Sequence, residues 1–132
     1  MDRLFPRDIG SLDDLFAFIR DFLSAENLDP ARAFDVDLVA EELFTNMVKY
    51  NGPGRHDIAV TLDRAGSDIV LTLKDRDVDP FDPTAAPEVD VTRPVSERKA
   101  GGLGIHFVRQ IAREVRYDYT DGVSTVTVTL EA

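Results

Sequence analysis

Apolar residues recur at helical spacing in two segments of the first half of the chain. The first segment predicts an amphipathic helix over residues 12–25, and its stripe includes aromatic side chains. A second stripe predicts a helix over residues 35–50, which the run Asn51-Gly52-Pro53-Gly54 ends. Ser11 is the expected N-cap of the first helix, with Asp14 at the capping-box position. The first stripe consists of Leu12, Leu15, Phe16, Ile19, Phe22 and Leu23.

Alternation of apolar and polar residues, the pattern of half-buried strands, predicts a sheet in the remaining sequence. A hairpin turn is expected at residues 63–66, and Asp121-Gly122 is a strong signal for a second, two-residue turn. The predicted strands lie at residues 2–6, 58–62, 68–75, 115–119 and 123–130. Pro6 limits the first of these, which favours an edge position.

Residues 76–100 break this pattern, because they contain four prolines and few apolar residues. A loop of this length within a compact domain is typically functional or disordered. The glycine run 101–104 then leads into a helix with Ile105, Val108, Ile111 and Ala112 on its apolar face. The element order predicts an α+β fold: a two-layer sandwich with a mixed, mostly antiparallel sheet and three helices on one face. We expect a single domain over residues 1–132.

Composition narrows the function classes. The chain of 132 residues carries 25 acidic and 15 basic residues, a net charge of −10, which argues against direct nucleic-acid binding. The absence of cysteine excludes disulfides, thiolate metal sites and thiol nucleophiles. The apolar runs are short, and the start of the sequence lacks a signal-peptide pattern. We therefore expect a cytoplasmic protein that does not enter a membrane.

Three short motifs could carry chemistry. Glu42 and Asn46 lie one helical turn apart beside the buried stripe, and their oxygens are hard ligands of the kind that Mg²⁺ accepts. The alternative for this pair is a solvated polar face. Asp75 ends a strand, where its carboxylate could accept a hydrogen bond from a buried amine or simply terminate the strand.

The third motif is Gly101-Gly102-Leu103-Gly104 at a helix N-terminus, preceded by Arg98 and Lys99. Backbone amides in such a turn can close on phosphate oxygens, and the helix N-terminus and the cations add positive charge. A flexible hinge after the loop is the alternative.

Together these motifs resemble the GHKL ATP-binding fold. Residues 42–46 (ELFTN) resemble its N-box, the Asp75 region takes the place of its D-x-G box, and GGLG resembles its glycine box. The sequence Phe81-Asp82-Pro83 and the run from residue 101 to 122 are similar to anti-sigma-factor serine kinases of bacterial partner switching. The resemblance covers essentially the whole chain.

The resemblance implies a role for each motif. Glu42 would be the general base, Asn46 would coordinate Mg²⁺, and Asp75 would bind the adenine amino group. The glycines at 101, 102 and 104 would wrap the phosphates of ATP or ADP, beneath an ATP lid at residues 84–100. We also count Lys49, Asp77, Lys99, Leu103 and Thr125 among the expected nucleotide contacts.

The function that this resemblance implies is that of an anti-sigma regulatory serine/threonine kinase. Such a protein binds Mg-ATP, phosphorylates a STAS-domain anti-sigma antagonist, alternately sequesters a sigma factor or similar target, and forms a homodimer. One departure is visible: Asp77 stands where the D-x-G glycine is expected, and one residue is inserted before Phe81. A non-catalytic nucleotide-binding or pseudokinase partner-binding module is therefore the alternative. A detached histidine-kinase catalytic domain is a third reading.

Overall fold

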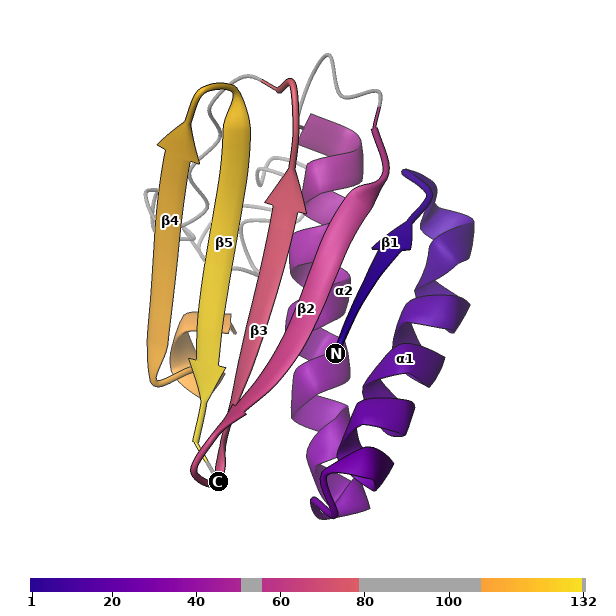
Figure 1. Ribbon diagram of the computed structural model, residues 1–132, viewed down its shortest axis with the longest axis vertical. Helices are drawn as coiled ribbons and strands as arrows, with labels where there is room; N and C mark the ends of the chain where they lie inside the picture. The colour runs from indigo at the N-terminus through magenta and orange to yellow at the C-terminus, as the bar shows by residue number, and fades with distance from the viewer. Residues whose placement is uncertain (51–55, 79–107, 132) are drawn as a thin grey trace, which may run out of the picture.

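Five strands form one sheet in the order β1-β2-β3-β5-β4, and all four of these pairings are antiparallel (Figure 1). The structure is a computed structural model that describes residues 1–50, 56–78 and 108–131. The sheet is continuous although β3 and β4 are far apart in the sequence, because β5 returns between them. The strands are β1 (Asp2–Phe5), β2 (Ile58–Ala65), β3 (Asp68–Asp75), β4 (Glu114–Thr120) and β5 (Val123–Leu130).

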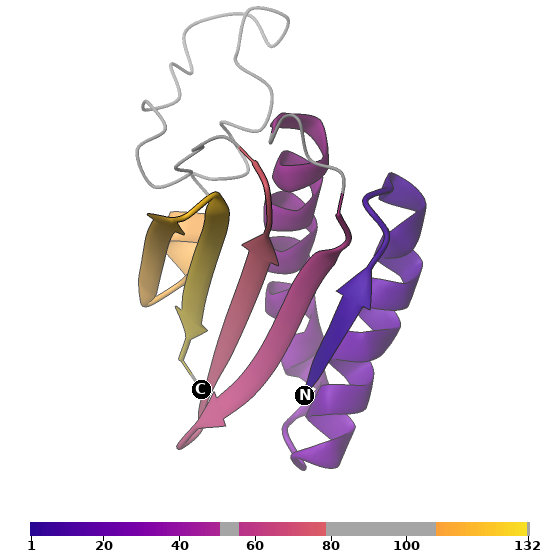
Figure 2. The same ribbon diagram turned by 45° about the horizontal axis from the view of Figure 1, so that its top comes forward.

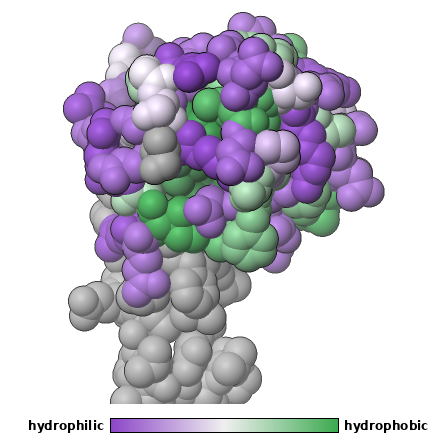
Figure 3. All heavy atoms as spheres, turned by 90° about the horizontal axis from the view of Figure 1, so that it is seen from below, coloured by the Kyte–Doolittle hydropathy of each residue, from purple (hydrophilic) through white to green (hydrophobic). Residues whose placement is uncertain are grey.

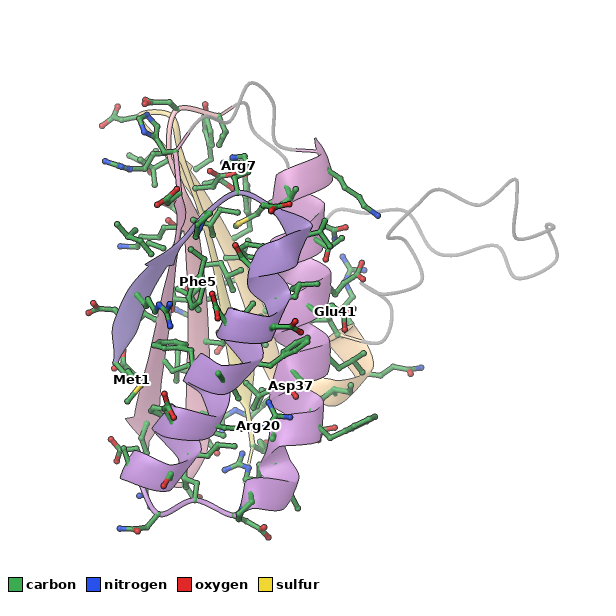
Figure 4. The ribbon with its side chains drawn as sticks, turned by 90° about the vertical axis from the view of Figure 1, so that its right-hand side faces the viewer. Met1, Phe5, Arg7, Arg20, Asp37 and Glu41 are labelled. Atoms are coloured by element: carbon green, nitrogen blue, oxygen red, sulfur yellow. The ribbon has the colours of Figure 1, made fainter. Side chains whose placement is uncertain are left out.

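The helices α1 (Leu12–Ala25) and α2 (Ala33–Tyr50) pack on one face of the sheet, and residues 108–111 are helical on the same side (Figures 1 and 2). Arg20 of α1 donates to the Asp37 carboxylate of α2 at 2.9 Å (Figure 4). The predicted two-layer α+β sandwich is confirmed. Among the described helices, none is long and apolar enough to cross a membrane.

The core lies between the sheet and the helices. Alternate residues of β2, β3 and β5 face the helices and are buried, which is the consequence of the period of two. The opposite face of β5 carries threonines that remain half-buried. In α1, Phe18 is more deeply buried than the pattern predicted, and in α2 Phe44 joins the core through an edge-on contact with Phe5.

The predicted N-cap position at Ser11 is confirmed, but the expected side-chain cap hydrogen bond is not formed. Ser11 has helical dihedrals, lies at the end of a short 3₁₀ turn (Ile9–Ser11), and makes no side-chain cap hydrogen bond. Its hydroxyl instead donates to the Pro6 carbonyl at 2.8 Å. The local competition of serine side chains for nearby backbone groups therefore resolves toward the preceding turn.

The first hairpin turns later than predicted, at Gly66 and Ser67, because β2 continues through Ala65. Gly66 has φ +65°, which explains why the turn centres on this glycine. The second turn agrees with the prediction: Asp121 and Gly122 have φ of 52° and 79°, as a type I′ turn requires.

Arg32 forms hydrogen bonds at the end of the sheet where β2 turns into β3. Its guanidinium donates to three backbone carbonyls, those of Ser67 at 2.6 Å, Leu130 at 3.2 Å and Glu131 at 2.5 Å. Figure 3 views this end directly, and hydrophilic side chains cover most of it with apolar ones in small groups. Arg32 thus joins the start of α2 to the β2–β3 turn and to the adjacent end of β5.

We expect Arg32→Met to lower the free energy of unfolding by about 1–3 kcal/mol, because three carbonyls lose a charged donor while the aliphatic stem is kept. Chemical denaturation measures the change. Arg116→Met is the matched control, since the exposed Arg116 bonds within its own strand to Glu114. A loss for Arg32→Met no larger than that of the control would refute a stabilising role for the three Arg32 hydrogen bonds.

Candidate functional site

Asp75 is the last residue of β3, and its side chain is completely buried. Alternation places it on the same face as Leu71 and Leu73, toward the helices. A buried carboxylate requires a charged or hydrogen-bonding partner, since burial of an unpaired charge is very unfavourable. That partner is Arg7, whose guanidinium forms an ion pair with the Asp75 carboxylate.

Arg7 also connects Asp75 to α2. One guanidinium nitrogen donates to the Asp75 carboxylate, and the other donates to the Met47 carbonyl at 2.8 Å. Figure 4 shows Arg7 beside the upper end of α2. Because a single guanidinium contacts both, the end of β3 and the turn of α2 that follows Asn46 are close neighbours. No local sequence pattern signals this contact, because its two residues are 68 positions apart.

Asn46 and Glu42 occupy the predicted position beside the buried stripe. Asn46 is 5% exposed, and its amide nitrogen donates to a Glu42 carboxylate oxygen at 3.3 Å. Burial raises the pKa of Glu42 above its ordinary value of 4.5, although the hydrogen bond from Asn46 acts in the opposite direction. The Glu41 charge raises the same pKa further and the exposed Lys49 lowers it. A carboxylate with a raised pKa beside an amide oxygen suits proton acceptance near a bound cation.

The structure does not bring Thr125 to this group. Thr125 pairs in register with Lys74 on the sheet face that points away from the helices. Ser124 is the β5 residue opposite Asp75, and it is 1% exposed with a buried hydroxyl that has no hydrogen-bond partner among the described residues. The strand parity could have identified it, because Ser124 shares the face of Val126.

Asp77 has a backbone conformation that favours glycine. Its φ is 55°, in the left-handed region that L-residues rarely adopt and that aspartate tolerates better than most. Its exposed carboxylate contacts His56 Nε2 at 2.5 Å. The amide of Val78 donates to the Gly122 carbonyl at 3.1 Å, and Tyr119 donates to the Val78 carbonyl at 2.7 Å. The β4–β5 end of the sheet therefore holds this segment in place.

We expect Asp77→Gly to preserve stability to within about 1 kcal/mol, because glycine adopts a positive φ without steric cost. Asp77→Ala should be less stable than Asp77→Gly by about 1 kcal/mol, since alanine keeps the strain and lacks a polar side chain. Both variants lose the His56 contact, so they form a matched pair in thermal unfolding. Equal stability of the two variants would contradict a strained backbone at this position.

The remaining predicted contacts lie outside the described residues. These are Lys99, the glycines at 101, 102 and 104 with Leu103, and the lid at residues 84–100. Within residues 1–50, 56–78 and 108–131, no group of three His, Asp or Glu residues could hold a metal by itself. A cation near Asn46 would therefore need additional ligands, such as nucleotide phosphates.

Comparison with known proteins identifies the family. The histidine kinase-like ATPase domain matches residues 5–130. The chain belongs to this family. Among curated proteins, none matches the chain.

Solved structures share the fold at low sequence identity. The structure of the RsbU and RsbW domains of Rv1364c from Mycobacterium tuberculosis has a TM-score of 0.68 and 18% identity, and the match covers 99% of this chain and 32% of that one. The SiaB-SiaC complex from Pseudomonas aeruginosa gives a TM-score of 0.66, 18% identity, and coverage of 98% and 88%. The Acinetobacter baumannii histidine kinase AdeS gives a TM-score of 0.54 at 14% identity, and the match covers 99% of this chain and 67% of that one. The chain thus spans about a third of the Rv1364c chain.

Proposed function

We propose that this histidine kinase-like ATPase domain is an ATP-dependent protein serine kinase. The observation that carries the proposal is that three groups of polar side chains lie at one end of the fold. Glu42 and Asn46 on α2 form one group, the buried Asp75 at the end of β3 is the second, and the buried Ser124 hydroxyl opposite Asp75 is the third. In a family of ATPases, this arrangement supports nucleotide binding between α2 and the ends of β3 and β5.

Each group has a role suited to its chemistry. The Asp75 carboxylate would accept a hydrogen bond from the adenine amino group, with the Ser124 hydroxyl beside it as a further donor or acceptor. The Asn46 carbonyl oxygen would be a ligand of Mg²⁺, which supplies charge neutralisation for the phosphates. The Glu42 carboxylate would accept the proton of the attacking serine hydroxyl, for which its burial and raised pKa are favourable.

The finer assignment rests on the resemblance to anti-sigma-factor kinases and on the likeness to structures that contain an RsbW domain and a SiaB-SiaC complex. We propose that the substrate is a serine of a STAS-domain anti-sigma antagonist and that a sigma factor or similar target is the alternate partner. Homodimer formation belongs to the same proposal. The net charge of −10 favours a basic partner surface.

Transfer of labelled phosphate from ATP to a STAS-domain protein tests this function. The test substrate is a purified STAS-domain antagonist protein, and its Ser→Ala variant is the matched control. We expect Mg-dependent labelling of the unsubstituted STAS protein and none of the Ser→Ala variant. Failure to label the substrate under conditions where calorimetry detects Mg-ATP binding would contradict the proposed kinase activity. The protein would then be a nucleotide-binding protein without phosphate transfer.

The second candidate function is a nucleotide-binding module that holds its partner without phosphorylating it. Asp77 favours it, because a side chain occupies the place where the D-x-G box has glycine. The same labelling experiment separates the two candidates. A stable complex with the partner that forms in the presence of nucleotide, without any phosphate transfer, would favour the binding module.

A further inference from the structure

The carboxylate that would bind the adenine amino group is already engaged within the protein. Asp75 is completely buried, and the Arg7 side chain that pairs with it is only 13% exposed. We propose that Arg7 competes with the purine base for Asp75 and thereby sets the affinity of the base subsite. This inference rests on the proposed nucleotide function, and it concerns a residue that the sequence motifs do not include.

Competition follows from the donors involved. A guanidinium is a charged donor, and its hydrogen bond to a carboxylate is stronger than that of the neutral amino group of a base. A base that takes over the Asp75 carboxylate therefore exchanges a strong contact for a weaker one. The exchange lowers the affinity for the base by the difference between the two contacts.

The placement of Arg7 allows this exchange. Arg7 lies in the connection between β1 and the 3₁₀ turn at Ile9–Ser11, so its displacement breaks no strand pairing and no helix hydrogen bond. The polar atoms near Asp75 also favour a ligand. Arg7 Nε and the Ser124 hydroxyl are both buried, and neither has a hydrogen-bond partner among the described residues. Buried polar atoms normally find a partner, and a base at Asp75 would offer one to Ser124.

Displacement of Arg7 would also change a contact of α2, the helix that carries Glu42 and Asn46. The same guanidinium donates to the Met47 carbonyl, one residue after Asn46. Base binding would remove that contact at the same time as the Asp75 contact. Arg7 is therefore a positioning residue as well as a competitor, because it couples the base subsite to the turn of α2 that carries Asn46.

Adenosine is the sharpest probe, since it contains the base without phosphates or metal. Titration calorimetry would compare the wild type with Arg7→Gln and Arg7→Lys. Arg7→Gln keeps a neutral donor for Asp75 and should bind adenosine about tenfold more tightly than the wild type. Arg7→Lys keeps the positive charge and is the matched control, expected to bind like the wild type.

Chemical rescue separates competition from a purely structural role. In Arg7→Ala, added millimolar guanidinium chloride should refill the place beside Asp75 and weaken adenosine binding again. Sodium chloride at the same ionic strength is the control and should have a smaller effect. The wild type, which carries its own guanidinium, should respond to both salts alike. Thermal unfolding checks that each variant is folded, and if Arg7→Ala is not, the Arg7→Gln comparison decides.

Two results would overturn the inference. A folded Arg7→Gln that binds adenosine no more tightly than the wild type would show that Arg7 only neutralises Asp75. If the wild type binds Mg-ATP normally in that case, the proposed function stands and only the competition fails. If neither the wild type nor any Arg7 variant binds adenosine or Mg-ATP, the proposed function fails and this inference fails with it.

Discussion

Glu42→Gln is expected to slow phosphoryl transfer by about a hundredfold to ten-thousandfold while Mg-ATP binding changes little. A general base acts on the proton of the attacking hydroxyl and is not needed to hold the phosphates, which explains both the size and the selectivity of the effect. Glutamine preserves the shape of the side chain and the hydrogen bond with Asn46. Single-turnover transfer rates and calorimetric affinities measure the two effects separately.

Glu41→Gln is the matched control for this prediction. Glu41 lies on the same helix and carries the same charge, but its side chain is exposed, and Figure 4 labels it on α2. It should transfer phosphate at nearly the wild-type rate. Unchanged transfer by Glu42→Gln would move the base elsewhere and leave Glu42 as a support for Asn46.

The raised pKa of Glu42 adds a pH dependence. Burial disfavours the carboxylate, so the folded protein holds this proton at pH values above the ordinary 4.5 where the unfolded chain has already released it. The charge of Glu42 therefore lowers stability at neutral pH, and this loss is recovered as the pH falls through the raised pKa. Transfer activity should decline over the same window, because the base becomes protonated. A carboxylate whose burial costs stability is typical of a functional site.

Hydrophobic periodicity predicted the helices and strands because it is a local property of the sequence. Each helix and strand between residues 2 and 75 was located to within a few residues, and the Asp121-Gly122 turn was located correctly. The N-cap position of Ser11 was predicted correctly, but its side-chain hydrogen bond was not, because two backbone partners compete for one hydroxyl and local sequence does not decide between them. The packing of β5 between β3 and β4 completed the predicted sandwich.

The candidate site was predicted only in part, for two physical reasons. The Glu42–Asn46 pair is a helical neighbour contact, which spacing alone reveals. The Arg7–Asp75 ion pair joins residues with no pattern between them, so only the tertiary fold shows it. The predicted contact Thr125 is the neighbour of Ser124 in β5, and in a strand one residue is the difference between the two faces of the sheet.

Asn46→Ala is expected to abolish most of the Mg-dependent part of ATP binding, with a loss of about a hundredfold or more. Substitution of a residue that only orients a metal ligand already lowers metal affinity ten- to a hundredfold, and Asn46 would be a ligand itself. The fold should survive, because the described side-chain contact of Asn46 is a single 3.3 Å hydrogen bond to Glu42, worth about 1 kcal/mol.

Calorimetric titration with ATP in excess Mg²⁺ and in EDTA isolates the metal-dependent part. Wild-type affinity should fall when Mg²⁺ is removed, whereas Asn46→Ala should bind ATP equally weakly in both conditions. Thr45→Ala is the matched control, since Thr45 precedes Asn46 on α2 and is half-buried. It should keep the metal dependence. A folded Asn46→Ala protein that still binds Mg-ATP more tightly than metal-free ATP, by the wild-type ratio, would place the cation on other residues and detach Asn46 from the nucleotide site.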